Sequence, residues 1–123
     1  MTYNGLEEVE LDPETFWGRF FGNKYEANAM RRVNNLVASS PIFQIYHDGV
    51  LAVVRQYGMT LEDARPGLTE LYRKVLPHFV KDGKLSGLDA EHVNRLGELF
   101  GFTREYMDKL DAEELAKLRP SDS

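Results

Sequence analysis

The residues best suited to binding a metal or moving a proton are the three histidines, His47, His78 and His92, each of which lies near an aspartate. No two of them have the His-x-x-x-His spacing that places two ligands on one face of a helix, and no Glu-x-x-His pair occurs. A metal site would therefore have to be assembled by the fold from separate segments. We interpret these histidines instead as residues at the edges of apolar stripes, with polar partners.

A second candidate for metal chemistry is the acidic turn Asp82-Gly83-Lys84, which looks like the start of a calcium-binding loop. The third position of such a loop needs an oxygen ligand, and here it is Lys84. The twelfth position needs a bidentate glutamate, and here it is Val93. An ordinary EF-hand is therefore excluded.

The segment around this turn resembles the helix–turn–helix stretch of tellurite-resistance TerB-like domains. Those domains have an Asp-Gly turn, an acid about seven residues later, and then a helix that ends in a Leu-Gly type motif. The corresponding residues are Asp82 in 79–86, Asp89, and the Leu-Gly pair in 96–102, and the resemblance covers about 79–115. It implies a metal-binding role for Asp82 and Asp89. The alternative is that Asp82 only forms a turn and that Asp89 caps a helix.

Motifs for enzyme catalysis are missing from the sequence. The chain has no cysteine, which excludes thiolate nucleophiles, disulfides and thiolate metal sites. It also has no G-x-S-x-G elbow, no Walker pattern and no G-x-G-x-x-G loop. We therefore expect a protein that is not an enzyme and that carries no cofactor.

The most unusual feature is a dense aromatic cluster near the N-terminus. Phe16 with Phe20, and Trp17 with Phe21, form two i, i+4 pairs on a short predicted helix, and Tyr25 follows. The two pairs span a wide arc, so they do not easily face one core. We predict that these five residues bind a partner, either another protein or a second copy of the chain. The alternatives are a small-ligand pocket, or a helix that lies across the end of the bundle and buries all four side chains.

The charge of the chain is concentrated at its N-terminus. The net charge is −5, and residues 1–15 hold acids and no Lys or Arg: Glu7, Glu8, Glu10, Asp12 and Glu14. Outside residues 1–15 the acids and bases are equal in number. With no dense basic stripe, we expect no nucleic-acid binding. The absence of a signal peptide, of a long apolar run and of cysteine favours a cytoplasmic location without a membrane span.

The spacing of apolar residues predicts an all-α fold, a compact bundle of five or six helices in two layers with an acidic N-terminal arm. Length and composition favour one helical domain at 13–118, preceded by the arm at 1–12 and followed by a frayed tail at 119–123. Helices are expected at 24–38, 41–57, 87–100 and 103–110, with a short one at 13–21 and a last turn or two at 111–118. The main helix is expected after a capping-box pattern at Thr60–Asp63 and a short turn at Pro66, and Pro77 should end or kink it near residue 76. Ser86 is expected to cap the helix at 87–100.

The helix predicted at 41–57 is apolar on most sides and is therefore expected to be the central one. Phe43 and Tyr46 are assigned to its buried face, and Leu88 is assigned to the core stripe of the helix at 87–100. Together these features predict a non-enzymatic protein-interaction or accessory protein that acts through its acidic and aromatic N-terminal element. The alternative is a helical domain of a stress-response type that binds a small ligand or a metal.

Overall fold

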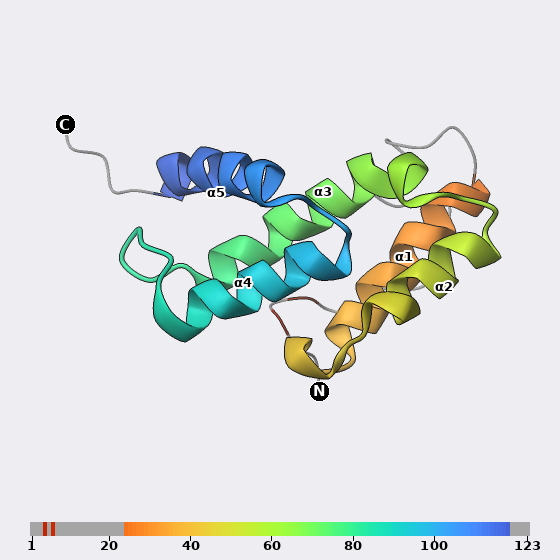
Figure 1. Ribbon diagram of the computed structural model, residues 1–123, viewed down its shortest axis with the longest axis horizontal. Coiled ribbons are helices and arrows are strands. Elements are labelled where there is room, and N and C mark those ends of the chain that lie inside the picture. Colours follow the sequence, from red (N-terminus) through yellow and green to blue (C-terminus); the bar gives the residue numbers. More distant parts are fainter. Residues whose placement is uncertain (1–3, 5, 7–23, 119–123) are drawn as a thin grey trace.

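The computed structural model describes residues 4, 6 and 24–118 of the chain. This part forms five α-helices and one short 3-10 turn (Figure 1). They are α1 (Lys24–Ala38), η2 (Ile42–Gln44), α2 (His47–Gln56), α3 (Leu61–Phe79), α4 (Gly87–Leu99) and α5 (Arg104–Leu118). The predicted all-α bundle is confirmed. In the same part of the chain, no helix is long and apolar enough to cross a bilayer.

The central helix is α3, because it packs against each of the other four α-helices. In Figure 1 the pair α1 and α2 lies toward one end of α3, and α4 and α5 lie toward the other. The buried residues of α3 are Ala64, Gly67, Leu68, Thr69, Leu71, Tyr72, Val75, Leu76 and Phe79. The expectation that the helix at 41–57 would be central was wrong, because that segment is not one helix.

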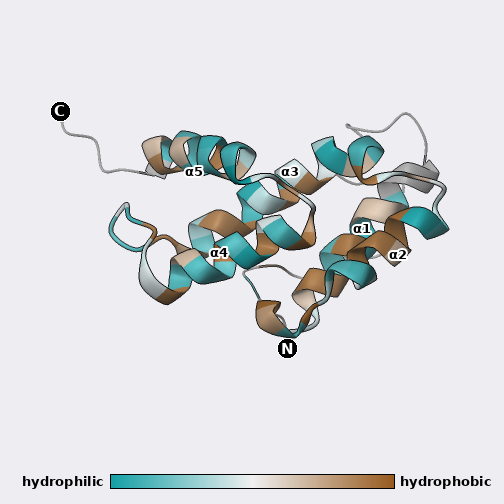
Figure 2. Cartoon of the chain, viewed as in Figure 1, coloured by the Kyte–Doolittle hydropathy of each residue, from teal (hydrophilic) through white to brown (hydrophobic). Residues whose placement is uncertain are grey.

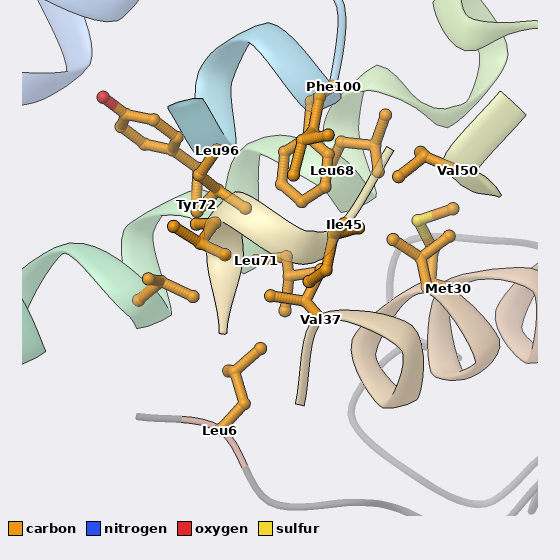
Figure 3. Packing of buried hydrophobic residues seen from close by; sticks show 14 of the residues in the cluster. Leu6, Met30, Val37, Ile45, Val50, Leu68, Leu71, Tyr72, Leu96 and Phe100 are labelled. Carbon is orange, nitrogen blue, oxygen red and sulfur yellow. The ribbon is translucent and has the colours of Figure 1, made fainter. Parts of the chain in front are cut away.

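The segment 41–57 is divided into η2 and α2. Ile45 and Tyr46 have extended backbone angles between the two, with φ of −100° and −105°. The single turn of η2 brings Ile45 back to the face of Ile42, and the extended backbone that follows points Tyr46 to the opposite face. Ile42 and Ile45 are accordingly both buried, whereas Phe43 and Tyr46 both face solvent. Figure 3 shows Ile45 among the labelled side chains of the core.

Leu88 is also exposed, although its helix was predicted correctly. Five residues separate it from Val93, a rotation of about 140° around the helix axis. That angle places Leu88 away from the buried stripe that Val93 and Leu96 form. Ser86 precedes α4 as predicted, but its side chain makes no capping hydrogen bond.

The start of α3 follows the sequence pattern closely. The amide of Asp63 donates to the Thr60 hydroxyl at 3.0 Å, and the amide of Thr60 donates to the Asp63 carboxylate at 3.0 Å. This reciprocal pair is the predicted capping box. The hydrogen bond from the Thr60 amide lowers the pKa of Asp63 below its usual value.

Neither proline ends α3. Pro66 and Pro77 both lie inside the helix and are exposed. The helix was predicted to end or kink near residue 76, but it continues to Phe79, which is buried and stacks on the His92 ring at 5.1 Å. The packing of Phe79 therefore offsets the loss of the backbone hydrogen bond that Pro77 cannot donate.

The C-terminal helix α5 is continuous, although two pieces were predicted. Asp111 was expected to begin a new helix, but its carboxylate accepts a hydrogen bond from the Tyr72 hydroxyl of α3 instead. The side chain is therefore not available to cap a helix start at that point. In Figure 2 hydrophilic residues recur along α5, whereas α1 and α2 carry longer apolar stretches.

Close packing between the α4 and α5 segments depends on a glycine. A Cβ atom at Gly97 would lie 2.0 Å from the Met107 sulfur and 2.7 Å from its Cγ. Met107 is buried, so its side chain occupies the space that the missing Gly97 side chain leaves. A side chain larger than the hydrogen of glycine would therefore not fit at position 97 without movement of Met107 or α5.

We expect Gly97→Ala to lower the free energy of unfolding by about 1 kcal/mol in urea denaturation. Overpacking costs about 1–3 kcal/mol, and the gain in helix propensity offsets about 1 kcal/mol of it. In a Met107→Ala background, where the space is free, the same substitution should instead raise the free energy of unfolding. Equal effects of Gly97→Ala in both backgrounds would contradict this packing.

Candidate functional site

The aromatic residues predicted to bind a partner are not placed by the structure. Phe16, Trp17, Phe20 and Phe21 lie outside the described residues. Tyr25 lies in α1, but its side chain is also outside the described part. Their role in partner binding stays a prediction.

The predicted metal ligands lie at the connection between α3 and α4. Lys81 and Lys84 exchange two backbone hydrogen bonds of 2.9 Å, and between them Asp82 and Gly83 have φ of 52° and 73°. These angles define a type I′ turn, which Asp-Gly favours. Asp82 is exposed, and Asp89 lies in the first turn of α4. The turn itself therefore accounts for Asp82, and metal binding by Asp82 and Asp89 stays a prediction.

The histidines are placed apart from one another. His47 has its Nδ1 atom 2.8 Å from the Leu99 carbonyl oxygen, and His92 has its Nδ1 atom 2.8 Å from the Leu88 carbonyl oxygen. The His78 ring contacts the edge of the Phe79 ring. Among the described residues, no three His, Cys, Asp or Glu side chains form a group that would hold a metal.

Exposed aromatic side chains mark a different surface. Phe43 is 50% exposed and Tyr46 is 73% exposed, and both belong to the connection between α1 and α2. Because Ile42 and Ile45 are buried, this connection is anchored to the core and the two aromatic rings are held outward from it. Sequence reasoning missed these residues by assigning them to a buried helix face. The available signal was the pair Ile42 and Ile45, three residues apart and directly after Pro41.

Tyr46 borders an open hollow, which we call the α1–α2 groove. It has a volume of about 590 Å³ and opens widely to solvent. It is lined by Leu36, Ser40, Gln44, Ile45, Tyr46, Asp48 and Gly49. The carbons of Leu36, Ile45 and Tyr46 make it mainly apolar, and polar side chains lie among them. A Cβ atom at Gly49 would lie 3.4 Å from Leu36, so this glycine leaves room between α1 and α2.

The end of α1 beside this groove is held by hydrogen bonds. The Asn4 side-chain amide donates to the carbonyl oxygens of Val37 at 2.7 Å and Ser40 at 2.9 Å. The Ser39 hydroxyl donates to the Leu36 carbonyl oxygen at 2.7 Å. The last carbonyls of a helix have no partner within it, and these bonds satisfy some of them. The groove is therefore formed by a fixed helix end.

On the side facing α4, Phe43 is held by an aromatic contact. Its ring meets the edge of the His92 ring at a centroid distance of 4.7 Å. The His92 ring also stacks on Phe79, and its Nδ1 atom lies 2.8 Å from the Leu88 carbonyl oxygen. Half of Phe43 remains exposed despite these contacts. The ring therefore has a preferred position before any partner binds.

Two further hollows lie near α5. One, of about 260 Å³, lies between the start of α3 and the connection from α4 to α5. The other, of about 470 Å³, runs along α3, where the Arg65 guanidinium lies 3.9 Å from the centre of the Tyr106 ring. Arg73 is paired there with Glu70 at 2.9 Å and with Glu113 at 3.2 Å. Charges of both signs alternate along this surface, so it has no preference for a ligand of one charge.

A buried polar pair joins α3 to α5. The Tyr72 hydroxyl donates to the Asp111 carboxylate, and Tyr72 is fully buried. Burial raises the pKa of Asp111, and the hydrogen bond from Tyr72 opposes that rise. Burial and the neighbouring carboxylate raise the pKa of Tyr72 well above its usual value. Because Tyr72 is closed to solvent, we assign the pair to stability and not to chemistry on a substrate.

We expect Tyr72→Phe to lower the free energy of unfolding by about 1–3 kcal/mol, because it leaves a partly buried carboxylate without its donor. Asp111→Asn keeps an acceptor but removes the charge. Because folding raises the pKa of Asp111, the free energy of unfolding of the wild type falls as the pH rises through this folded-state pKa. In urea unfolding from about pH 3 to about pH 7, the free energy of unfolding of Asp111→Asn should therefore rise relative to that of the wild type as the pH increases. A constant difference across that range would contradict the assignment.

We expect Gly83→Ala to lower the free energy of unfolding by about 1–2 kcal/mol, because alanine disfavours a positive φ. Asp82→Asn should change it by less than about 0.5 kcal/mol, since asparagine adopts the same conformation. Thermal or urea unfolding without added metal measures both. A larger loss for Asp82→Asn would show that the carboxylate has an interaction beyond the turn.

Comparisons of this chain with protein-family models, with curated proteins and with solved structures find no match. The interpretation of the site therefore depends on its geometry.

Proposed function

We propose that this chain is a non-enzymatic protein-interaction domain that binds a partner protein through the α1–α2 groove and the aromatic rings of Phe43 and Tyr46. The observation that carries the proposal is Tyr46, which is 73% exposed beside a mainly apolar groove. Tyrosine is enriched where proteins bind one another, and it often contributes much of the binding energy.

The rigidity of this surface favours binding. Tyr46 lies directly before α2, and its neighbour Ile45 is buried. Because the backbone is anchored there, binding a partner orders mainly the two side-chain torsions of Tyr46, which keeps the entropic cost of association low. The same argument applies to Phe43, whose ring already rests against His92.

A protein partner fits the groove better than a small ligand does. Pockets for small molecules usually cover about 70–90% of the ligand's surface. The α1–α2 groove is widely open to solvent, so a small molecule in it would stay largely exposed. A partner protein would cover the groove and the neighbouring rings together.

The acidic and aromatic N-terminal segment is proposed as a second binding element, on the basis of its sequence alone. A metal-binding or ligand-binding domain of the TerB-like type remains the alternative proposal. The feature in favour of it is the Asp82 turn with Asp89 in the following helix. Thermal unfolding with and without calcium or a transition metal tests that alternative, because a metal that binds only the folded state raises the melting temperature.

The test of the interaction proposal is a selection of peptides from a random phage-displayed library on the immobilised full chain. We expect selected peptides to bind Tyr46→Ser at least about tenfold more weakly than the wild type, because truncation of a central aromatic residue commonly costs more than about 1 kcal/mol. Leu88→Ser is the matched control. It also replaces a large exposed apolar residue by serine, but Leu88 does not line the groove.

Circular dichroism must show that both variants keep the helical fold. Selected peptides that bind Tyr46→Ser and the wild type equally would overturn the proposal, and so would a selection that yields no binder. A wild-type dimer that Tyr46→Ser dissociates in sedimentation equilibrium would support the interaction function and identify a second copy of the chain as the partner.

A further inference from the structure

We infer that the partner segment bound in the α1–α2 groove carries an apolar side chain close to a Lys or Arg, and that this cation pairs with Asp48. The inference rests on the proposed function and names the chemistry of the partner. Among the described residues that line the groove, Asp48 is the one with a charge. Asp48 therefore contributes a negative charge to the lining of the groove.

Asp48 is available for such a pairing. Its side chain is exposed, and none of the ion pairs formed by the described residues includes it. A base from α4 also reaches this turn, where the Ile45 carbonyl oxygen accepts a hydrogen bond from Arg95 at 3.2 Å. The Arg95 guanidinium is itself paired with Glu98 at 3.7 Å, which offsets part of its charge.

The position of Asp48 in the first turn of α2 gives it a structural role as well. A carboxylate there interacts favourably with the positive end of the helix dipole. Glu62 and Glu105 occupy the same position in α3 and α5. Asp48 differs from Glu105 because it lies in the wall of an apolar groove.

That difference determines which partner binds. A segment that fills the groove removes water from around Asp48, which is unfavourable for a carboxylate unless a cation replaces the lost hydration. A partner with Lys or Arg at this point supplies the cation, whereas one with an acid is repelled. The apolar floor thus provides affinity, and Asp48 selects among apolar partners.

The experiment uses the peptides selected on the full chain. We expect the peptides that depend on Tyr46 to share a Lys or Arg within about one helical turn of an apolar residue. Their dissociation constants, measured by fluorescence anisotropy, should rise about threefold to tenfold with Asp48→Asn. Added salt should reduce this difference, since screening weakens an exposed pair. Glu105→Gln is the matched control, because it removes a first-turn acid outside the groove.

A charge exchange gives the sharpest result. A peptide whose Lys or Arg is replaced by Glu should lose binding to the wild type and regain it with Asp48→Lys. If Asp48→Asn and Glu105→Gln have equal effects on peptides that still require Tyr46, the inference about the cation is overturned while the proposed function stands. If no selected peptide requires Tyr46, the proposed function fails first. Circular dichroism of each variant separates loss of binding from loss of fold.

Discussion

Burial of α3 is the interaction on which the rest of the structure depends. The other four α-helices all pack against this one, and its buried residues include large side chains such as Tyr72 and Phe79. One helix of this length cannot bury several faces by itself, so the remaining helices are arranged around it. This arrangement places α5 along one part of α3 and leaves the junction of α1 and α2 at the opposite edge of Figure 1. The α1–α2 groove lies at that junction, away from α5.

Most helices could be predicted from the sequence because their apolar residues recur with helical spacing and their ends carry clear signals. The bounds of α1 and the capping box of Thr60 and Asp63 followed directly from such patterns. Prediction failed at 41–57 because a segment that is apolar on most sides has no polar face to fix its rotation. A short 3-10 turn then changed which residues point inward. It also failed at Pro77 and Asp111, where contacts with distant residues, His92 and Tyr72, override local preference.

The candidate site was the least predictable part of the molecule. Phe43 and Tyr46 have the composition of core residues, and only the orientation set by Ile42 and Ile45 turns them outward. A groove is formed by segments that meet through folding, so no local pattern indicates it. The roles of Asp82 and Asp89 were open at the level of sequence, and the structure adds the positive φ of Asp82, which explains the Asp-Gly pair without a ligand. The aromatic residues 16–21 lie outside the described part of the chain.

The α5 face of the bundle and the α1–α2 junction differ in how their polar and apolar groups are satisfied. Between α3 and α5, Tyr72 is paired with Asp111, Thr69 with Tyr106, and Arg73 with Glu70, Glu113 and Glu114, so these groups have partners within the chain. At the α1–α2 junction, the Tyr46 ring remains in water beside apolar side chains, and Asp48, the charged residue among the described lining residues, forms none of the ion pairs described. The exposed ring lies outside the core, to which Ile42 and Ile45 belong at this turn. An aromatic side chain outside the core, held on an anchored turn beside an open groove, is what binding to another protein would require.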